Sequence, residues 1–215
     1  MNKTIEEKLN AGRAYRNFVR QMETREEADG GKIVEGYATV FNTVYELWRE
    51  PDFIVLEQIA PEAFDGCDMR DVIMQYNHEG RVFARTGNGT LTVTPDEVGL
   101  KVIANLGGTE LGGQVFEEIA GGYSDKMSFG FVVAEDKREV TEDRENNITT
   151  VLRTITRISK LYDVSVVSIP ANDATSISAR SYGEGVAAEL KEEHLKREQQ
   201  KKRIRILMEA TKDEF

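Results

Sequence analysis

Three polar residues stand inside or directly beside apolar segments of this chain. Ser128 lies in "KMSFGFVV", His78 follows "DVIMQY", and Asp163 lies in "LYDVSVVSIP". Histidine has an unperturbed pKa near 6.5, which suits general-base work near neutral pH. An aspartate in an apolar strand is unfavourable unless it has a partner, and an imidazole is a suitable one. These residue types could carry proton-transfer chemistry if the fold brings the three segments together.

The serine segment has a bulky face and a small face. Alternate side chains of a strand point to opposite sides, so Met127 and Phe129 share one face while Ser128 and Gly130 share the other. A glycine inside a strand often marks the close approach of a ligand or of another backbone. Gly130 is therefore a candidate for a substrate groove. The simpler interpretation is a surface serine on a half-solvated sheet.

The histidine and the aspartate also have simpler interpretations. His78 ends a strand just before Glu79 and Gly80, a position that suits a cleft, but it could equally be a surface histidine in a turn. Asp163 could be an edge-strand charge that opposes aggregation. The second histidine, His194, lies in a charged tail and is expected to face solvent.

Several other chemistries have no motif in the sequence. There is no G-x-S-x-G elbow, no H-E-x-x-H, no Cys/His cluster and no phosphate-binding glycine loop. Glu117 and Glu118 are adjacent on an expected helix and diverge, so they do not form a glycosidase pair. We therefore expect no metal and no cofactor.

Composition limits the class of protein. The 215 residues, 40% of them hydrophobic, suffice for one ordinary domain with tails. The 28 basic and 38 acidic residues give a net charge of -10, which argues against sequence-independent nucleic-acid binding. The single cysteine, Cys67, excludes an internal disulfide framework. We expect a soluble cytoplasmic protein, because the sequence has no secretory signal and no apolar run of the roughly 18 residues that span a bilayer.

Frequent turn signals and strand-like composition predict a mainly β (α+β) fold. We expect an antiparallel, barrel-like core with a few surrounding helices. Pro61 is expected to start a short helical turn, and Pro170 is expected to end the last strand. Residues 136–150 are polar and are expected to form a connection. The expected strands are residues 16–22, 32–41, 53–59, 71–76, 89–94, 99–106, 126–135 and one or two within 150–169.

Two segments are expected to be helical. Thr109 is a plausible N-cap for a helix with Leu111, Val115 and Ile119 on one face, and a Gly-Gly pair ends it. After Tyr182 the chain has no proline, and balanced charges predict a solvated or weakly associating helix. The expected organisation is an N-terminal arm (1–31), a folded domain (32–182) and a charged helical tail (183–215).

The order of segments between about residues 32 and 180 resembles the prohead (capsid maturation) serine proteases of tailed phages, the HK97-like group. Their fold is related to that of the herpesvirus assemblin proteases. The matching segments are "VEGYATVFN", "IAPEAF", "MQYNHEG", "LTVTPDEVGLKVIANL", "GGQVFEEIAGGYSDKMSFGFVV" and "ITRISKLYDVSVVSIPANDAT".

The resemblance implies a serine endopeptidase. His78 matches the family histidine, which acts as the base, and Ser128 matches the nucleophile. Asp163 falls at the position of the third member, which is a second histidine in the herpesvirus relatives. Asp125 and Glu79 are nearby alternatives for this acid.

The resemblance also implies partners and a place of action. The substrates would be capsid or scaffold chains, and the protease itself, inside the immature capsid (prohead) in the host cytoplasm. The tail would contact scaffold or be removed by self-cleavage. The herpesvirus relatives act as dimers, so self-association is a further expectation, whereas nucleic acid and membranes are not expected partners. The alternatives are a catalytically idle internal scaffold protein and a small-ligand β-barrel binder.

Overall fold

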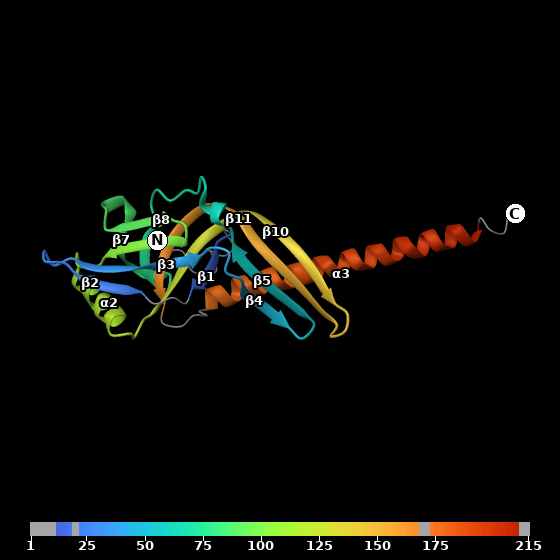
Figure 1. Cartoon of the computed structure of the whole chain (residues 1–215), viewed down its shortest axis with the longest axis horizontal. Helices are drawn as coiled ribbons and strands as arrows, with labels where there is room; N and C mark the ends of the chain where they lie inside the picture. The colour runs from blue at the N-terminus through green and yellow to red at the C-terminus, as the bar shows by residue number, and fades with distance from the viewer. Residues whose placement is uncertain (1–11, 19–21, 168–172, 211–215) are drawn as a thin grey trace.

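The computed structural model describes residues 12–18, 22–167 and 173–210. These residues form two β-sheets, two α-helices and two short 3₁₀ turns (Figure 1). The strands are β1 (Ala14–Phe18), β2 (Glu23–Glu26), β3 (Lys32–Val40), β4 (Tyr45–Glu50), β5 (Phe53–Ile59), β6 (Ile73–Tyr76), β7 (Glu79–Arg85), β8 (Leu91–Pro95), β9 (Gly99–Asn105), β10 (Lys126–Asp143) and β11 (Ile148–Val167). The helical elements are η1 (Pro61–Phe64), η2 (Thr86–Asn88), α2 (Glu110–Ala120) and α3 (Asp173–Ala210).

The larger sheet is organised around β11. Its strand order is β1-β10-β11-β5-β4, and the β6–β7 hairpin pairs with the later part of β11. Most pairs are antiparallel, as predicted, but β11 runs parallel to both β5 and β6. The mainly β composition is thus confirmed. Within the described residues neither sheet closes on itself, so the predicted barrel-like core is not confirmed.

The smaller sheet, in the order β2-β3-β9-β8, follows the local sequence signals closely. The predicted β8–β9 hairpin is present, and Thr109 caps α2 by accepting a hydrogen bond from the Gly112 N–H at 3.0 Å. Helix α2 packs against β2, β3 and β7. Buried residues of both sheets and of α2 form one main core, which includes Val34, Leu100, Phe116, Phe129 and Leu161.

The predicted polar connection at residues 136–150 is wrong. Strand β10 continues to Asp143 and β11 starts at Ile148, which leaves only a short turn between them. Charged side chains of the two strands pair across the hairpin, Arg157 with Glu135 at 2.6 Å among them. Such cross-strand pairs stabilise an exposed hairpin. Its polar composition differs from that of a buried strand, and for this reason the sequence predicted a connection instead.

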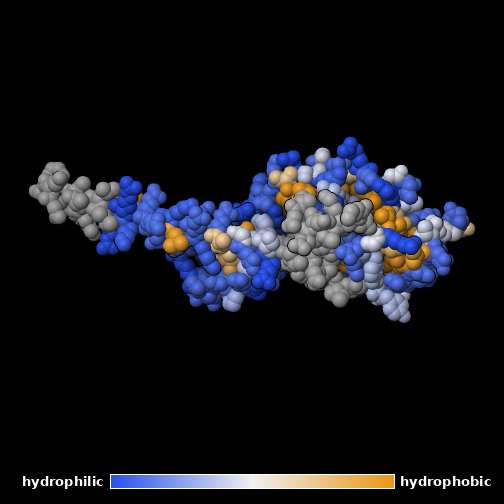
Figure 2. All heavy atoms as spheres, turned by 180° about the vertical axis from the view of Figure 1, so that it is seen from behind, coloured by the Kyte–Doolittle hydropathy of each residue, from blue (hydrophilic) through white to orange (hydrophobic). Residues whose placement is uncertain are grey.

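Helix α3 starts earlier than the predicted tail and has two different parts. Its first part packs Val186 and Ala187 against Phe53, Val55 and Val151, which forms a second small core. Beyond this contact the helix extends away from the sheets (Figure 1), and Figure 2 shows that its surface there is mainly hydrophilic. Among the helices that the structure describes, none combines the length and the apolar character needed to cross a bilayer.

The predicted domain boundaries remain predictions, although the described elements bear on them. Strands β1 and β2 lie within the expected N-terminal arm, and α3 begins within the expected folded domain. Part of the expected strand at residues 16–22 lies outside the described residues, and so does Pro170.

Candidate active site

The three polar residues singled out from the sequence come from two neighbouring strands of the larger sheet and from the hairpin turn beside them. Ser128 lies on β10 and Asp163 on β11, and His78 lies in the turn between β6 and β7. In the β10–β11 register, Gly130 is opposite Asp163 and Ser128 is opposite Ser165. Strand β6 flanks the same part of β11, with Ile73 beside Asp163. The pairing therefore places the serine, the acid and the histidine turn side by side.

His78 is presented by a tight hairpin turn. Tyr76 pairs with Glu79, and the two residues between them, Asn77 and His78, have φ values of +50° and +61°. Positive φ at both central positions is typical of a type I′ turn, whose twist matches that of the flanking strands, and Asn tolerates this conformation well. The turn directs a buried imidazole, rather than a surface one, toward β10 and β11.

The three side chains form one hydrogen-bonded chain. His78 Nε2 lies 2.6 Å from Ser128 Oγ, and His78 Nδ1 contacts Asp163 Oδ1. The Ser165 hydroxyl donates to the same Asp163 oxygen at 3.2 Å. His78 and Ser128 are 0% exposed and Asp163 is 1% exposed. This is the order of contacts that activates a serine hydroxyl: an imidazole on the oxygen and a carboxylate on the far ring nitrogen.

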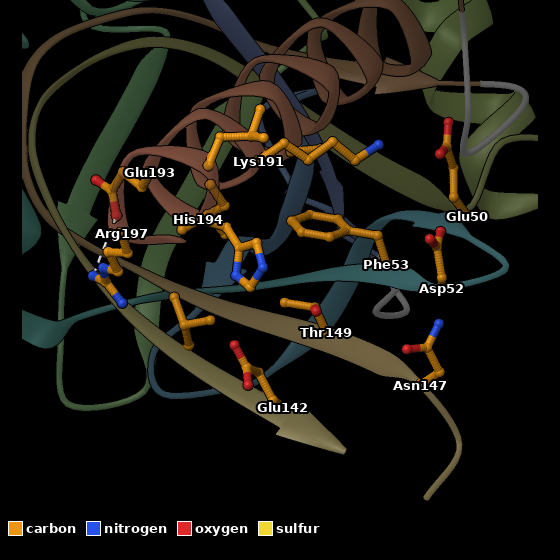
Figure 3. Close-up of a pocket in the computed structure, with 14 residues that line it drawn as sticks. Glu50, Asp52, Phe53, Glu142, Asn147, Thr149, Lys191, Glu193, His194 and Arg197 are labelled. Carbon is orange, nitrogen blue, oxygen red and sulfur yellow. Dashed lines mark ion pairs between the residues drawn. The ribbon is translucent and has the colours of Figure 1, made fainter. Parts of the chain in front are cut away.

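The alternative residues lie elsewhere. Asp125 is exposed and its carboxylate accepts from Lys126 Nζ at 2.9 Å, while Glu79 is also exposed. His194 lies on α3, where it lines a groove between that helix and the β5, β10 and β11 strands (Figure 3). Of the acids considered, Asp163 is the one whose carboxylate contacts His78.

Cys67 is a poor alternative nucleophile. Burial raises the pKa of the Cys67 thiol to about 11, so little thiolate is present at neutral pH. Among the described residues, no group of three His, Cys, Asp or Glu side chains is placed to hold a metal ion.

The space beside Gly130 is occupied by this chain's own side chains. A Cβ added to Gly130 would lie 2.5 Å from Asp163 Oδ2 and 2.8 Å from Tyr15 Cε1. The Tyr15 ring packs against the His78 ring with their centroids 4.4 Å apart. Burial raises the pKa of the Tyr15 phenol to about 12, and the negative charge of Asp163 adds to this shift. The glycine therefore makes room for the acid and an aromatic ring, and its predicted role in a substrate groove remains untested.

The edge of β10 beside Ser128 is covered by β1. The two strands are antiparallel, with Tyr15 opposite Gly130 and Asn17 opposite Ser128. The Ser128 hydroxyl lies 3.0 Å from the Arg16 carbonyl oxygen. Ser128 therefore touches the backbone of a segment that precedes it by more than a hundred residues.

A buried ion cluster holds the side chain of Arg16. Its guanidinium pairs with both oxygens of Glu57, which also accepts from Arg153 at 2.9 Å and from the Tyr45 hydroxyl at 2.6 Å. Arg153 makes a second ion pair with Asp136 at 2.6 Å. Burial alone would raise the pKa of the Glu57 carboxyl, but the charges of Arg16 and Arg153 outweigh burial and lower it.

Sequence analysis did not identify Tyr15, Arg16, Glu57 or Arg153. A signal was present for two of them. Glu57 shares a strand face with Val55 and Ile59 in "FIVLEQI", and Arg153 likewise alternates with apolar residues. A charge on the buried face of a strand needs a partner. This pattern of alternation predicts two buried charges but does not identify the residues that neutralise them.

A serine, an imidazole and a carboxylate in one buried chain of contacts have the arrangement used by serine hydrolases. Comparison with known families agrees. The model of the caudovirus prohead serine protease family matches residues 20–188, and the chain belongs to this family. It is thus a serine endopeptidase of the capsid maturation class. No curated protein and no solved structure matches the chain, and the predicted relationship to herpesvirus assemblins remains a prediction.

Proposed function

We propose that Ser128, His78 and Asp163 form the catalytic triad of this protease. The observation that carries the proposal is the continuous contact from Ser128 Oγ through both ring nitrogens of His78 to Asp163. The three residues lie within the matched range 20–188. A scaffold protein without activity has no need of this buried polar arrangement, whose desolvation is costly.

Each group has its own role in this proposal. Ser128 Oγ attacks the carbonyl carbon of the substrate while His78 Nε2, 2.6 Å away, takes the hydroxyl proton. The imidazolium that forms then returns this proton to the leaving amine. Asp163 accepts from the Nδ1–H of His78, which fixes the tautomer and stabilises the positive ring.

Ser165 is a positioning residue in this scheme. Its hydroxyl donates to Asp163 Oδ1, the oxygen that contacts the imidazole. The Ser165 contact thereby helps to hold this oxygen in its orientation toward the imidazole.

The proposed substrates are proteins of the prohead. Family membership supports capsid proteins as substrates in general. We further propose that scaffold chains and the protease itself are cut, and that the exposed outer part of α3 serves as a scaffold contact or is removed by self-cleavage. Self-association remains a prediction, since only one chain is described.

The test is to express the full chain and its Ser128→Ala form, each alone and with the capsid precursor, and to map new termini by mass spectrometry. We expect cleavage by the wild type and none by Ser128→Ala. Identical termini from both forms would assign the cleavage to another nucleophile. Absence of cleavage by either form would favour the idle scaffold instead.

A further inference from the structure

Strand β1 pairs in antiparallel register with the edge of β10 that β11 does not occupy, and its Arg16 carbonyl oxygen is 3.0 Å from the Ser128 hydroxyl. Addition of an extended segment to a sheet edge is a common mode of peptide recognition, in which backbone pairing supplies affinity and side-chain pockets supply specificity. The residues matched by the family model start at 20, after the end of β1.

The two faces of β1 make different contacts. Neighbouring side chains of a strand point to opposite faces, so Tyr15 lies over His78 while Arg16 enters the cluster around Glu57. Arg16 is 3% exposed and Glu57 is 0% exposed. The arginine therefore fills a closed pocket at the residue whose carbonyl touches the nucleophile.

We propose that β1 is a substrate-like strand bound in cis, and that the pocket around Glu57 selects peptides with arginine on the acyl side of the scissile bond. This inference rests on the proposed triad and adds the substrate class. Capsid chains can enter only when β1 leaves the edge of β10, so β1 also restrains the enzyme.

The charge balance of the pocket supports a cationic occupant. Buried Glu57 pairs with two guanidinium groups, those of Arg16 and Arg153; Arg153 is shared with Asp136, which also faces Arg138 at 3.6 Å. Without Arg16, Glu57 would share its remaining guanidinium, that of Arg153, with Asp136, and a buried carboxylate without full compensation is costly. The vacated pocket therefore favours a positive side chain. Both Glu57 oxygens contact Arg16, and arginine matches this paired geometry better than lysine does.

The chemical step is ordinary acyl transfer. Ser128 Oγ bonds to the carbonyl carbon of the arginine in the substrate peptide, and the hydroxyl proton moves to His78. The C–N bond to the next residue then breaks, and the leaving amine takes the proton from His78. Water hydrolyses the ester, which leaves an arginine carboxylate and regenerates the serine.

The test uses full-length protein and quenched fluorescent peptides built on "AYRNF", the sequence of β1 itself, with the arginine kept or replaced by Lys, Leu or Glu. A fluorophosphonate that labels activated serines gives a readout independent of peptide sequence. The enzyme forms are the wild type, Arg16→Glu and Arg16→Ala, with Ser128→Ala as the unlabelled control. Arg16→Glu opposes Glu57 and should expel β1, whereas Arg16→Ala removes the same contact without adding a charge.

We expect the Arg16 variants to be labelled about tenfold faster than the wild type, since one lost charge pair of this kind commonly exceeds a tenfold effect. They should also cleave the arginine peptide at least about tenfold better than the leucine peptide. Adding Glu57→Gln to Arg16→Ala should lower this ratio of kcat/KM values by about tenfold. The matched change Glu135→Gln, at an exposed carboxylate paired with Arg157, should leave the ratio unchanged.

Two results overturn the inference in distinguishable ways. The first result is that the folded Arg16 variants are labelled at Ser128 but show no preference for arginine, or are labelled no faster than the wild type. This result would leave the proposed triad intact and would exclude the substrate-like role of β1. If circular dichroism shows folded protein and no form is labelled, the proposed triad itself fails and the inference falls with it.

Discussion

The carboxylate of Asp163 occupies the space that a side chain at Gly130 would need. A Cβ at Gly130 would lie 2.5 Å from Asp163 Oδ2, closer than real contacts allow. The same carboxylate touches His78 through its other oxygen. The position of Asp163 on β11 therefore requires that residue 130 on β10 has no side chain.

Gly130→Ala should therefore impair catalysis as well as stability. The methyl group must displace Asp163 or the Tyr15 ring, and misplacement of a catalytic group by about 1 Å can cost about 100-fold in rate. We expect a loss of kcat/KM of that order and a stability cost of about 1–3 kcal/mol. Peptide cleavage and thermal unfolding measure the two effects. Gly113→Ala is the control, because its Cβ would approach only the end of the Lys32 side chain; equal losses in both variants would contradict the coupling.

Asp163→Asn should retain the fold and lose most of the activity. The amide is nearly the same size as the carboxylate, but it can hold His78 in the wrong tautomer and cannot stabilise the imidazolium. We expect kcat to fall by about 10³–10⁴-fold. Steady-state kinetics measure this, with Asp125→Asn as the matched change at an exposed acid paired with Lys126. A comparable loss in Asp125→Asn would move the role of the acid away from Asp163.

At Asn77, in the turn that carries His78, glycine should be tolerated and a β-branched residue should be destabilising. Asn77 has a φ of +50°, a conformation that costs a non-glycine residue about 1–2 kcal/mol and a β-branched residue more. Asn77→Val should therefore lower stability and, by shifting His78, activity as well. Asn77→Gly should keep both close to wild type. Urea unfolding and peptide cleavage report the two effects, and similar behaviour of the two variants would argue that the turn conformation does not position His78.

The stability of the folded chain should decrease in acid because of Glu57. Its pKa is lowered from the ordinary value of 4.5, since the charges of Arg16 and Arg153 outweigh the effect of burial. The native state then binds fewer protons than the unfolded chain between the two pKa values. The contribution is complete above the unfolded pKa and is lost as the pH falls through the folded pKa.

Urea unfolding of wild type and Glu57→Gln from pH 7 to pH 3 measures this contribution. The difference in unfolding free energy between the two should narrow at low pH, where a protonated Glu57 resembles glutamine. A difference that stays constant with pH would show that the ionised form of Glu57 has no stabilising role.

Two glycines of α3 should respond oppositely to alanine. Within a helix, Gly→Ala ordinarily stabilises by about 0.5–1 kcal/mol. A Cβ at Gly185 would meet nothing within 4 Å, so Gly185→Ala should show this gain. At Gly183 a Cβ would lie 2.4 Å from the Trp48 ring, so Gly183→Ala should push α3 off the sheet and lower the melting temperature. Thermal unfolding of both variants tests the docking of α3; a gain at both positions would show that this part of the helix is not held against Trp48.

Local signals in the sequence predicted much of the smaller sheet, whereas the residues of the proposed triad each had a simpler local interpretation. Thr109 and the residues after it specify α2 on their own, and the β8–β9 hairpin depends on nearby turn residues. The resemblance to prohead proteases singled out Ser128 and His78, and contact with His78 distinguishes Asp163 from Asp125 and Glu79.

The unpredicted features depend on partners that are distant in sequence. Arg16 and Glu57 are separated by 41 residues, and Glu57 and Arg153 by 96. No local window can show that these three charges meet. The extension of β10 and β11 through charged residues has the same origin, because each strand is stabilised by the other across the hairpin.

Because Ser128 has no exposed surface while β1 lies beside it, the measured rate of the resting enzyme should depend on a minority population. In the proposed role of β1, only molecules with β1 detached turn over, so the observed kcat/KM is the intrinsic value multiplied by their fraction. Each 1.4 kcal/mol by which β1 prefers its bound position lowers this fraction about tenfold. Temperature, mild denaturant or a competing peptide would therefore change the activity by changing how many molecules are open, without any change in the catalytic groups themselves.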